Sequence, residues 1–192
     1  MIAKFKPCTL NGTVNAPPSK SMAHRYLIGA ALSGQICRLS GVDYSEDILA
    51  SIDCLKALGA QITIDADTVT VDPTGFMKAE HPVLECRESG STLRFFIPLA
   101  LCLGREVTLR GSRRLFERPL TVYEELCLEN QFTFRKDADS VVLCGKIKAA
   151  VTGSEVISAV SSLPASSSLC STRLKSLSLR SFHLLKAGRT LT

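Results

Sequence analysis

The sequence predicts an α/β fold built from a repeated unit. From residue 17 onward, stretches with helical spacing of apolar residues alternate with short stretches of period-two alternation. The same order of helix, strand, helix and hairpin occurs twice, at a period of roughly 70 residues. Alternation of this kind predicts helices packed on mixed sheets. Two related α/β units are therefore expected.

Four helices are expected from the spacing of the apolar residues. They cover residues 21–32, 46–58, 90–103 and 119–128. Gly34, Gly59 and Gly104 follow the first three, and glycine is a common helix stop. Ser45 can cap the second helix, and the two acidic residues after it suit the positive end of the helix dipole.

The strands are expected from period-two alternation between these helices. They cover residues 61–65, 68–72, 106–109, 132–134 and 141–143. The first two flank the short turn Ala66-Asp67, and the last two also follow one another closely, so each pair predicts a hairpin.

The composition favours a soluble globular protein. Of the 192 residues, 45% are hydrophobic and 21% are charged, which supplies enough apolar material for a core. No apolar stretch reaches the roughly 18 residues that cross a bilayer, and residues 1–6 lack the apolar core of a signal peptide. We therefore expect a cytoplasmic protein without a membrane partner.

Cysteine spacing and charge distribution argue against two other classes. The eight cysteines include no C-x-x-C pair, which disfavours a zinc site or a disulfide framework, and residues such as Cys54 and Cys102 are expected to fill core space. Residues 1–153 carry 18 basic and 17 acidic side chains, whereas residues 154–192 carry 5 and 1. A nucleic-acid binder should gather its cations on the folded part, so no nucleic-acid partner is expected.

The segment from Pro17 to Ser21 leads directly into the first predicted helix. Ser19, Lys20 and Ser21 therefore lie where free backbone N–H groups and the helix dipole favour an anion. Arg25 follows Ser21 by four residues, so the two share one helical face. A capped and solvated helix end is the commoner explanation of such a segment alone, and an anion site is the alternative.

The segment from Glu88 to Arg94 repeats this design in the second unit. Gly90 allows close approach of a ligand, hydroxyl residues surround it, and Arg94 lies just inside the helix. A glycine turn followed by a surface arginine is the alternative explanation. Two such segments at equivalent positions of a repeat make that alternative less attractive.

The segment from Arg110 to Pro119 contains four arginines within nine residues and precedes a helix. Arginine binds carboxylate and phosphate groups through two parallel hydrogen bonds. A solvated charge run or an RNA contact is the alternative, but the interleaved Leu115 and Phe116 and the balanced charge of residues 1–153 favour a small anion.

Together these segments resemble the 5-enolpyruvylshikimate-3-phosphate synthases. The first has the family form P-x-S-K-S-x-x-x-R, the second is a Gly/Ser/Thr-rich helix start that ends in Arg94-Phe95, and the third ends in Glu117-Arg118-Pro119. The match runs in order from residue 7 to about residue 150. It implies the enolpyruvyl transferase fold, an inside-out α/β barrel of repeated βαβαββ units, here as an incomplete single lobe.

The resemblance also implies roles for individual residues. Lys20 would be catalytic and would meet both substrates, shikimate-3-phosphate and phosphoenolpyruvate. Ser21 and Arg25 would bind shikimate-3-phosphate together with Lys20. Gly90 and Arg118 would complete the phosphoenolpyruvate site.

Three positions are less clearly assigned by the resemblance. Arg94 and Arg114 match family arginines without a firm role, and Glu88 stands where the family often has Asn, so its function is open.

The implied reaction transfers the enolpyruvyl group to the 5-hydroxyl of shikimate-3-phosphate in aromatic amino-acid biosynthesis. It needs no metal or organic cofactor, and a full-length member would be a monomer.

A UDP-N-acetylglucosamine enolpyruvyl transferase is the alternative within this fold. That family typically has a Lys-Asn pair early in the chain and a catalytic Cys in the loop that corresponds to residues 111–118. This chain has Lys20-Ser21 and no Cys in that loop. The first family is therefore favoured.

The chain is expected to divide into a partial lobe of two repeat units, residues 1–150, and a serine- and leucine-rich tail, residues 151–192. The family motif Gly-Asp-Ile-Ser-Ser-Gln-Phe, expected after residue 148, is absent, although one choice of codons for residues 155–162 encodes it in another reading frame. We therefore expect a frameshift near residue 149 or 150 and a disordered tail. An inactive truncated fragment is the alternative to an active enzyme, and we expect no turnover by this chain itself, because the acid-base residues of the opposite lobe are absent.

Overall fold

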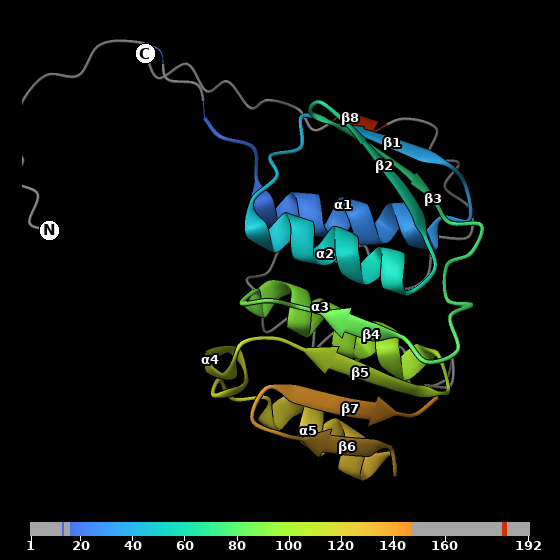
Figure 1. Cartoon of the computed structure of the whole chain (residues 1–192), viewed down its shortest axis with the longest axis vertical. Helices are drawn as coiled ribbons and strands as arrows, with labels where there is room; N and C mark the ends of the chain where they lie inside the picture. Colours follow the sequence, from blue (N-terminus) through green and yellow to red (C-terminus); the bar gives the residue numbers. More distant parts are fainter. Residues whose placement is uncertain (1–12, 14–15, 147–181, 184–192) are drawn as a thin grey trace, which may run out of the picture.

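The helices and strands follow the predicted order in the structure, a computed structural model that describes residues 13, 16–146 and 182–183 (Figure 1). The first unit consists of α1 (Lys20–Leu32), β1 (Cys37–Ser40), α2 (Glu46–Ala57), β2 (Gln61–Asp65) and β3 (Thr68–Asp72). The second consists of β4 (Val83–Glu85), α3 (Gly90–Cys102), β5 (Glu106–Arg110), α4 (Arg113–Phe116), α5 (Thr121–Glu129), β6 (Thr133–Lys136) and β7 (Ser140–Cys144). A two-residue strand, β8 (Phe182–His183), completes the described elements.

The two sheets have equivalent topologies. The first has the order β2-β3-β1-β8 and the second has β6-β7-β5-β4 when it is read from the hairpin side. β1 pairs in parallel with β8, as β5 does with β4, and the other pairings are antiparallel. The mixed sheets and the internal repeat of the predicted α/β fold are therefore confirmed.

No residue range was predicted for four short elements, which are β1, β4, α4 and the two-residue β8. β4 has three residues and β1 has four, which is too few for an alternating pattern to stand out. α4 is a single turn inside the arginine-rich segment, and the hydroxyl of Ser112 caps it by accepting a hydrogen bond from the Leu115 N–H at 3.3 Å. The four predicted helices and both hairpins are confirmed, with ends that differ by a few residues.

The core is continuous between the two units. α2 packs against both α1 and α3, and Figure 1 shows α1 and α2 between the first sheet and α3. Leu27, Ile52 and Phe96, one from each of these helices, are fully buried. Each such side chain stabilises the fold by about 1.5–3 kcal/mol relative to exposure. This packing fixes the starts of the three helices relative to one another.

The described cysteines are free thiols, but they do not all lie in the core. Cys54 is buried as expected. The expectation for Cys102 was wrong. Cys102 is the last residue of α3, and it is exposed. Within the described residues, no helix is long and apolar enough to span a membrane, and no group of His, Cys, Asp and Glu could hold a metal ion.

The predicted division at residue 150 falls outside the described residues, as does most of the predicted tail. Within that tail, residues 182 and 183 form β8 at the edge of the first sheet. The frameshift and the disorder of the tail stay predictions.

Candidate functional site

The α1 entrance, residues 19–25, has the predicted capped start. Ser19 has extended backbone angles, φ −74° and ψ 107°, and its hydroxyl accepts a hydrogen bond from the Met22 N–H at 3.4 Å. Arg25 Nη1 donates to the Ser21 carbonyl at 2.7 Å, so these two residues share one face as predicted. The Arg25 guanidinium also lies 5.4 Å from the ring centroid of Phe95 on α3.

Lys20 forms an ion pair that the sequence did not predict. Its Nζ lies 2.5 Å from Oδ2 of Asp47, in the first turn of α2. The hydrogen bond from Lys20, followed by its charge, lowers the pKa of the Asp47 carboxyl. Asp47 therefore stays ionised at neutral pH and fixes the direction of the Lys20 side chain.

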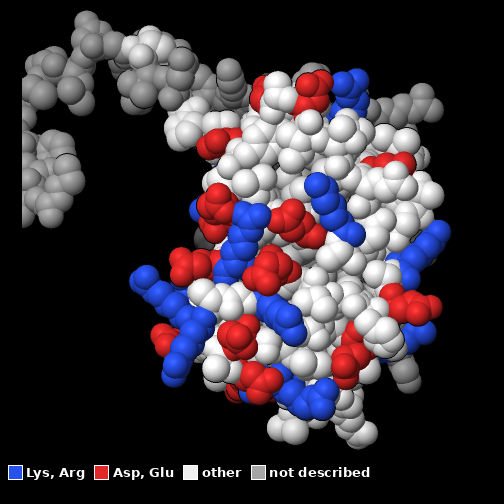
Figure 2. Space-filling view, in the orientation of Figure 1, with Lys and Arg blue, Asp and Glu red and all other residues white. Residues whose placement is uncertain are grey.

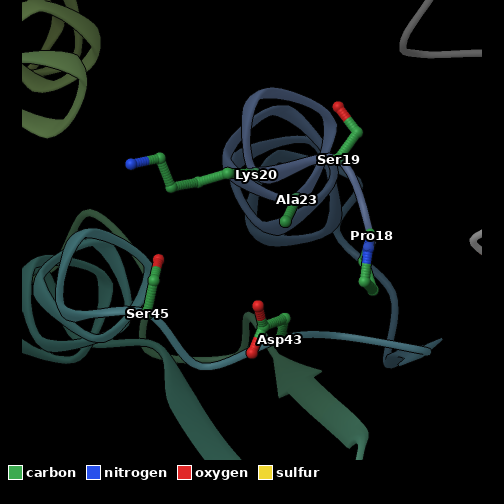
Figure 3. Close-up of a pocket in the computed structure, with 6 residues that line it drawn as sticks. All are labelled: Pro18, Ser19, Lys20, Ala23, Asp43 and Ser45. Atoms are coloured by element: carbon green, nitrogen blue, oxygen red, sulfur yellow. The ribbon is translucent and has the colours of Figure 1, made fainter. Parts of the chain in front are cut away.

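A small pocket of about 50 Å³ lies beside this ion pair (Figure 3). It is lined by Pro18, Ser19, Lys20, Ala23, Asp43 and Ser45. Ser45 precedes α2, yet its hydroxyl does not cap the helix and has no hydrogen-bond partner among the described residues. The pocket thus places a free hydroxyl beside the Lys20 side chain.

The α3 entrance, residues 89–94, repeats the capped start in a buried setting. Ser89 is 2% exposed, and its hydroxyl accepts hydrogen bonds from the N–H of Thr92 at 3.1 Å and the hydroxyl of Thr92 at 2.7 Å. Ser19, by contrast, is exposed. The second cap is therefore the tighter of the two.

Two guanidinium groups converge on Gly90. A Cβ atom added there would overlap Nη1 of Arg118 and would lie 3.0 Å from Nη1 of Arg94. Arg94 Nη1 approaches the Gly90 carbonyl at 3.4 Å, and in the described part of the chain neither arginine has an acidic partner. The absence of a side chain at residue 90 thus allows two unpaired cations to meet at a helix N-terminus, where an anion is favoured.

A proline inside α3 is compensated by a residue of α5. Pro98 has no N–H, so the carbonyl of Arg94, four residues earlier, loses its helical donor. The Tyr123 hydroxyl donates to this carbonyl at 3.2 Å instead. The backbone that carries Arg94 is therefore anchored to α5, which follows Arg118 in the chain.

The third predicted segment contributes one residue to this arrangement. Arg118 reaches Gly90, whereas Arg114 is exposed on α4 and does not approach Gly90. Ser112 N–H donates to the Arg87 carbonyl at 2.7 Å, which ties this segment to the loop before α3. Glu88 is exposed in that loop, and its function stays open.

Arg87 holds the same loop to α2. Its guanidinium pairs with Glu46 and lies 2.7 Å from Oδ2 of Asp53. Its φ angle is +52°, a left-handed conformation that is unfavourable for a residue with a side chain. Gly111 is required nearby, because a Cβ at that position would lie 2.5 Å from the Arg87 carbonyl oxygen.

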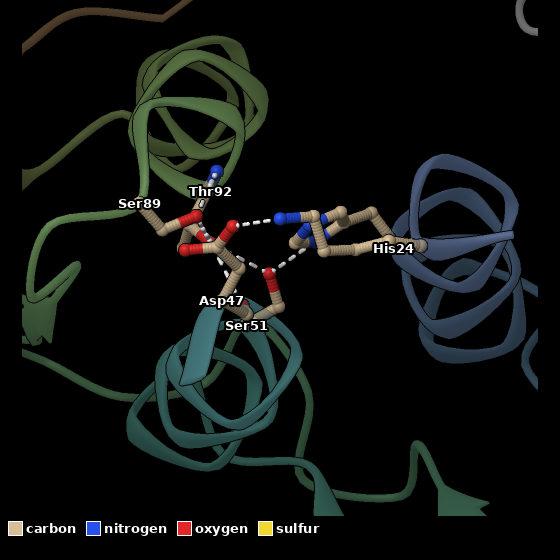
Figure 4. Close-up of polar contacts among 6 residues, drawn as sticks. His24, Asp47, Ser51, Ser89 and Thr92 are labelled. Atoms are coloured by element: carbon tan, nitrogen blue, oxygen red, sulfur yellow. Dashed lines mark hydrogen bonds and ion pairs between the residues drawn. The ribbon is translucent and has the colours of Figure 1, made fainter. Parts of the chain in front are cut away.

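A series of hydrogen-bonded polar side chains, here called the chain of bonds, connects α1, α2 and α3 near both entrances (Figure 4). Nδ1 of His24 on α1 lies 2.8 Å from Oγ of Ser51 on α2, which lies 2.9 Å from Oγ1 of Thr92 on α3. Thr92 Oγ1 also approaches the backbone carbonyl of Asp47 at 3.2 Å. Burial is the largest effect that lowers the pKa of His24, to about 4, so the ring is neutral at pH 7.

The structure thus places Lys20, Ser21 and Arg25 at one helix start, and Gly90, Arg94 and Arg118 at another. Asp47 links the two, because its carboxylate pairs with Lys20 and its backbone carbonyl lies 3.2 Å from the Thr92 hydroxyl. Asp47 was expected only to favour the start of its own helix. No local spacing reveals the link, because the partners are 27 and 45 residues apart.

Solved structures share this fold. A structure of EPSP synthase from Acinetobacter baumannii matches with a TM-score of 0.63 and 19% identity, over 78% of this chain and 37% of that chain. A second structure of EPSP synthase from the same organism matches with a TM-score of 0.60 and 20% identity, over 70% of this chain and 32% of that chain. The fold class is therefore that of the enolpyruvyl transferases, as predicted, and the described part is a portion of it.

The sequence comparisons narrow this class to one family. The family model described as EPSP synthase (3-phosphoshikimate 1-carboxyvinyltransferase) matches residues 5–127. The 3-phosphoshikimate 1-carboxyvinyltransferases of Clostridium kluyveri and Clostridium novyi are 39% and 42% identical to this chain, over 146 and 137 residues. These matches cover 75% and 67% of this chain. The chain belongs to the EPSP synthase family.

The matched part is a minority of each relative. The chain spans 34% of the Clostridium kluyveri protein and 31% of the Clostridium novyi protein.

Proposed function

We propose that this chain serves the transfer of the enolpyruvyl group from phosphoenolpyruvate to the 5-hydroxyl of shikimate-3-phosphate, with release of phosphate. The observation that carries the proposal is the pair of helix entrances linked by Asp47, one with Lys20 and one with two unpaired guanidiniums at Gly90. Two polyanionic substrates need such a concentration of cations, because their charges would otherwise repel.

Shikimate-3-phosphate is assigned to the α1 entrance. Lys20 supplies an ammonium, Ser21 supplies a hydroxyl, and Arg25 supplies a guanidinium on the same face of the helix. The free N–H groups of the first turn add to the attraction for a phosphate. Arg25 would exchange its contact with the Ser21 carbonyl for the substrate, since a charged acceptor forms the stronger hydrogen bond.

Phosphoenolpyruvate is assigned to the α3 entrance. Arg118 lies against Gly90, and its planar guanidinium suits a carboxylate or phosphate group. Arg94 lies beside it and would share the negative charge. Lys20 would meet both substrates from the neighbouring entrance, where Asp47 directs its ammonium group.

The chemistry requires positioning more than a strong nucleophile. The substrate hydroxyl oxygen bonds to the enol carbon that bears phosphate, while a proton adds to the methylene carbon. Loss of phosphate and of a methyl proton then restores the double bond. Lys20 and Arg118 stabilise the negative charge of the departing phosphate and hold the reactants in register.

We also propose a cytoplasmic location, a monomeric full-length protein and no nucleic-acid partner, in keeping with the mixed acidic and basic surface in Figure 2.

The proposal is tested by binding and by turnover with the full chain. Calorimetric titration should show binding of shikimate-3-phosphate and of phosphoenolpyruvate, and Lys20→Ala should weaken both by about thirtyfold, because a charged hydrogen bond is lost. Lys56→Ala is the matched control, since Lys56 is exposed near the end of α2. Equal binding by the wild type and Lys20→Ala would contradict the assignment.

Phosphate release then separates an active enzyme from a binding portion. Purified chain is given both substrates, and release is compared with that of Lys20→Ala. Release above this control supports an active enzyme. Binding without release identifies the chain as the anion-binding portion of the family's site, the alternative considered above.

A further inference from the structure

His24 is a fully buried polar side chain whose role the proposed function does not explain. It is 1% exposed and lies one helical turn after Lys20 on α1. Its Nδ1 contacts the Ser51 hydroxyl, but its Nε2 has no hydrogen-bond partner among the described residues. An imidazole in this setting costs desolvation free energy, so its polar atoms require an explanation.

The neighbouring hydroxyls determine which nitrogen of His24 carries the proton. The single hydroxyl hydrogen of Thr92 is directed at Ser89 Oγ, 2.7 Å away, or at the Asp47 carbonyl at 3.2 Å. The Ser51 hydroxyl, 2.9 Å from Thr92, must therefore donate to Thr92. Ser51 then accepts from His24, which places the histidine proton on Nδ1 and leaves Nε2 as an unpaired acceptor. A buried unpaired acceptor is less unusual than a buried unpaired N–H group.

The hydrogen bonds consequently run in one direction. His24 donates to Ser51, and Ser51 donates to Thr92. The Thr92 hydroxyl lies 3.2 Å from the Asp47 backbone carbonyl and 2.7 Å from Ser89 Oγ, and it donates its one hydrogen to one of these two acceptors. Asp47 also accepts from Lys20. The chain of bonds therefore begins and ends on α1 and passes through α2 and the α3 cap (Figure 4).

Stability alone does not explain this chain of bonds. Each hydrogen bond contributes only about 1 kcal/mol net to stability. Well-packed apolar side chains of similar volume between the helices would therefore stabilise the fold at least as much. Apolar contacts are non-directional, whereas hydrogen bonds fix the distance and angle between groups. Fixed distances and angles matter here because Lys20 and Gly90 are on different helices, α1 and α3, and the site needs them in a fixed relative position.

We propose that His24, as the Nδ1–H tautomer, is a positioning residue that orients Asp47, and through its carboxylate Lys20, by way of Ser51 and Thr92. This inference rests on the proposed function only where it concerns substrate. The tautomer and the placement of Lys20 are properties of the free protein, so they can be measured separately.

The first measurement is nitrogen-15 NMR of the full chain labelled at histidine. His24 is assigned from its absence in His24→Asn. The expected spectrum shows a protonated Nδ1 and an unprotonated Nε2 at pH 7, and Ser51→Ala should abolish this preference because it removes the acceptor. A protonated Nε2 in the wild type would overturn the proposal.

The second measurement follows Lys20 by carbon-13 NMR of lysine-labelled chain, with the signal assigned from Lys20→Arg. In Ser51→Ala and His24→Leu the Lys20 signal should move toward its position in Asp47→Asn. His24→Asn should retain the wild-type position, because its amide can donate where Nδ1 does. If His24→Leu does not fold, the shift of the Lys20 signal in Ser51→Ala is the test. An unmoved signal in folded Ser51→Ala would overturn the proposal.

The third measurement is the dissociation constant for shikimate-3-phosphate. We expect about a tenfold increase in Ser51→Ala, the loss typical of one misplaced contact, and recovery in His24→Asn relative to His24→Leu. Ser140→Ala, on β7, is the control and should bind as the wild type does. If the wild type does not bind, the proposed substrate is wrong, and the two NMR measurements still decide the positioning role. Wild-type affinity in Ser51→Ala would refute the link between this chain of bonds and the substrate.

Discussion

At the α1 entrance the cation Lys20 is held by the carboxylate of Asp47, whereas at the α3 entrance Arg94 and Arg118 have no acidic partner in the described residues. Both entrances have a serine cap with extended backbone angles. They also start on the same side of the molecule, the side on which α4 lies (Figure 1). The internal repeat has therefore produced two similar backbones with different charge balances.

This difference indicates a division of labour between the units. A paired lysine is positioned before any ligand arrives, at the cost of part of its attraction for an anion. Two adjacent unpaired guanidiniums repel each other, and a bound anion relieves that repulsion. The first entrance is thus suited to orienting a substrate, and the second to neutralising one.

The largest expected difference between the entrances concerns pH, because α1 carries the buried His24. Burial lowers its pKa from 6.5 to about 4; Lys20 and Arg25 act in the same direction, and Asp47 opposes them. Between these pH values the unfolded chain binds a proton that the folded chain does not. The free energy of unfolding should therefore fall by about 3 kcal/mol from pH 6.5 to pH 4.

Urea unfolding across this pH range measures the effect. His24→Asn should flatten the dependence, whereas His81→Asn, at an exposed position, should retain it. Phe95 is the α3 side chain that faces the His24 ring, and it adds no charge. Asp47 has a lowered pKa, so the stability it adds is lost only at lower pH. An unchanged slope in His24→Asn would show that another group titrates.

The next effect concerns the crowded Gly90. In Gly90→Ala the new Cβ must displace the end of the Arg118 side chain, which is flexible, so folding should be little affected. Binding of phosphoenolpyruvate should weaken by about thirtyfold, or about 2 kcal/mol, because one guanidinium contact is lost. Calorimetric titration measures this change.

Gly29→Ala is the matched control for this substitution in α1. A Cβ at residue 29 would have no atom within 4 Å, so this variant should bind as the wild type does and be more stable by about 0.5–1 kcal/mol. Unchanged phosphoenolpyruvate affinity in Gly90→Ala would remove the α3 entrance from the proposed site.

The two caps should differ in their contribution to stability. Ser89→Ala removes a buried hydroxyl with two hydrogen bonds from Thr92 and should lower the free energy of unfolding by about 1.5 kcal/mol. Ser19→Ala removes an exposed hydroxyl at 3.4 Å and should cost about 0.5 kcal/mol. Chemical denaturation of both variants tests the order. Equal losses would mean that burial does not distinguish the caps.

The sequence predicted the regular elements because they repeat a local pattern. The helices from residues 20 and 90 and the hairpin of residues 61–72 have enough residues for their periods to be recognised. β4 and α4 are too short to show a period. Their places depend on pairing with distant strands and on the packing of α3.

The site could be predicted only where a motif carries it. Lys20 and Gly90 follow from their helix starts, and their substrate roles stay predictions. Asp47 and Ser51 could not be recognised, because their partners are 27 to 45 residues away and no local spacing records such contacts. An acidic first turn and a buried serine have ordinary local explanations, and only the packing of three helices brings them together.

The smallest expected effect concerns the loop before the α3 entrance. Arg87 has a φ angle of +52°, whereas none of residues 16–19 before α1 has a positive φ. Arg87→Ala should lower the free energy of unfolding by about 0.5 kcal/mol, because its ion pairs with Glu46 and Asp53 are partly exposed. Arg87→Gly loses the same pairs but relieves the left-handed strain, so it should be more stable than Arg87→Ala by about 0.5 kcal/mol. Urea unfolding of the two variants side by side separates strain from pairing. If Arg87→Ala is the more stable variant, the loop before α3 is no more strained than the segment before α1.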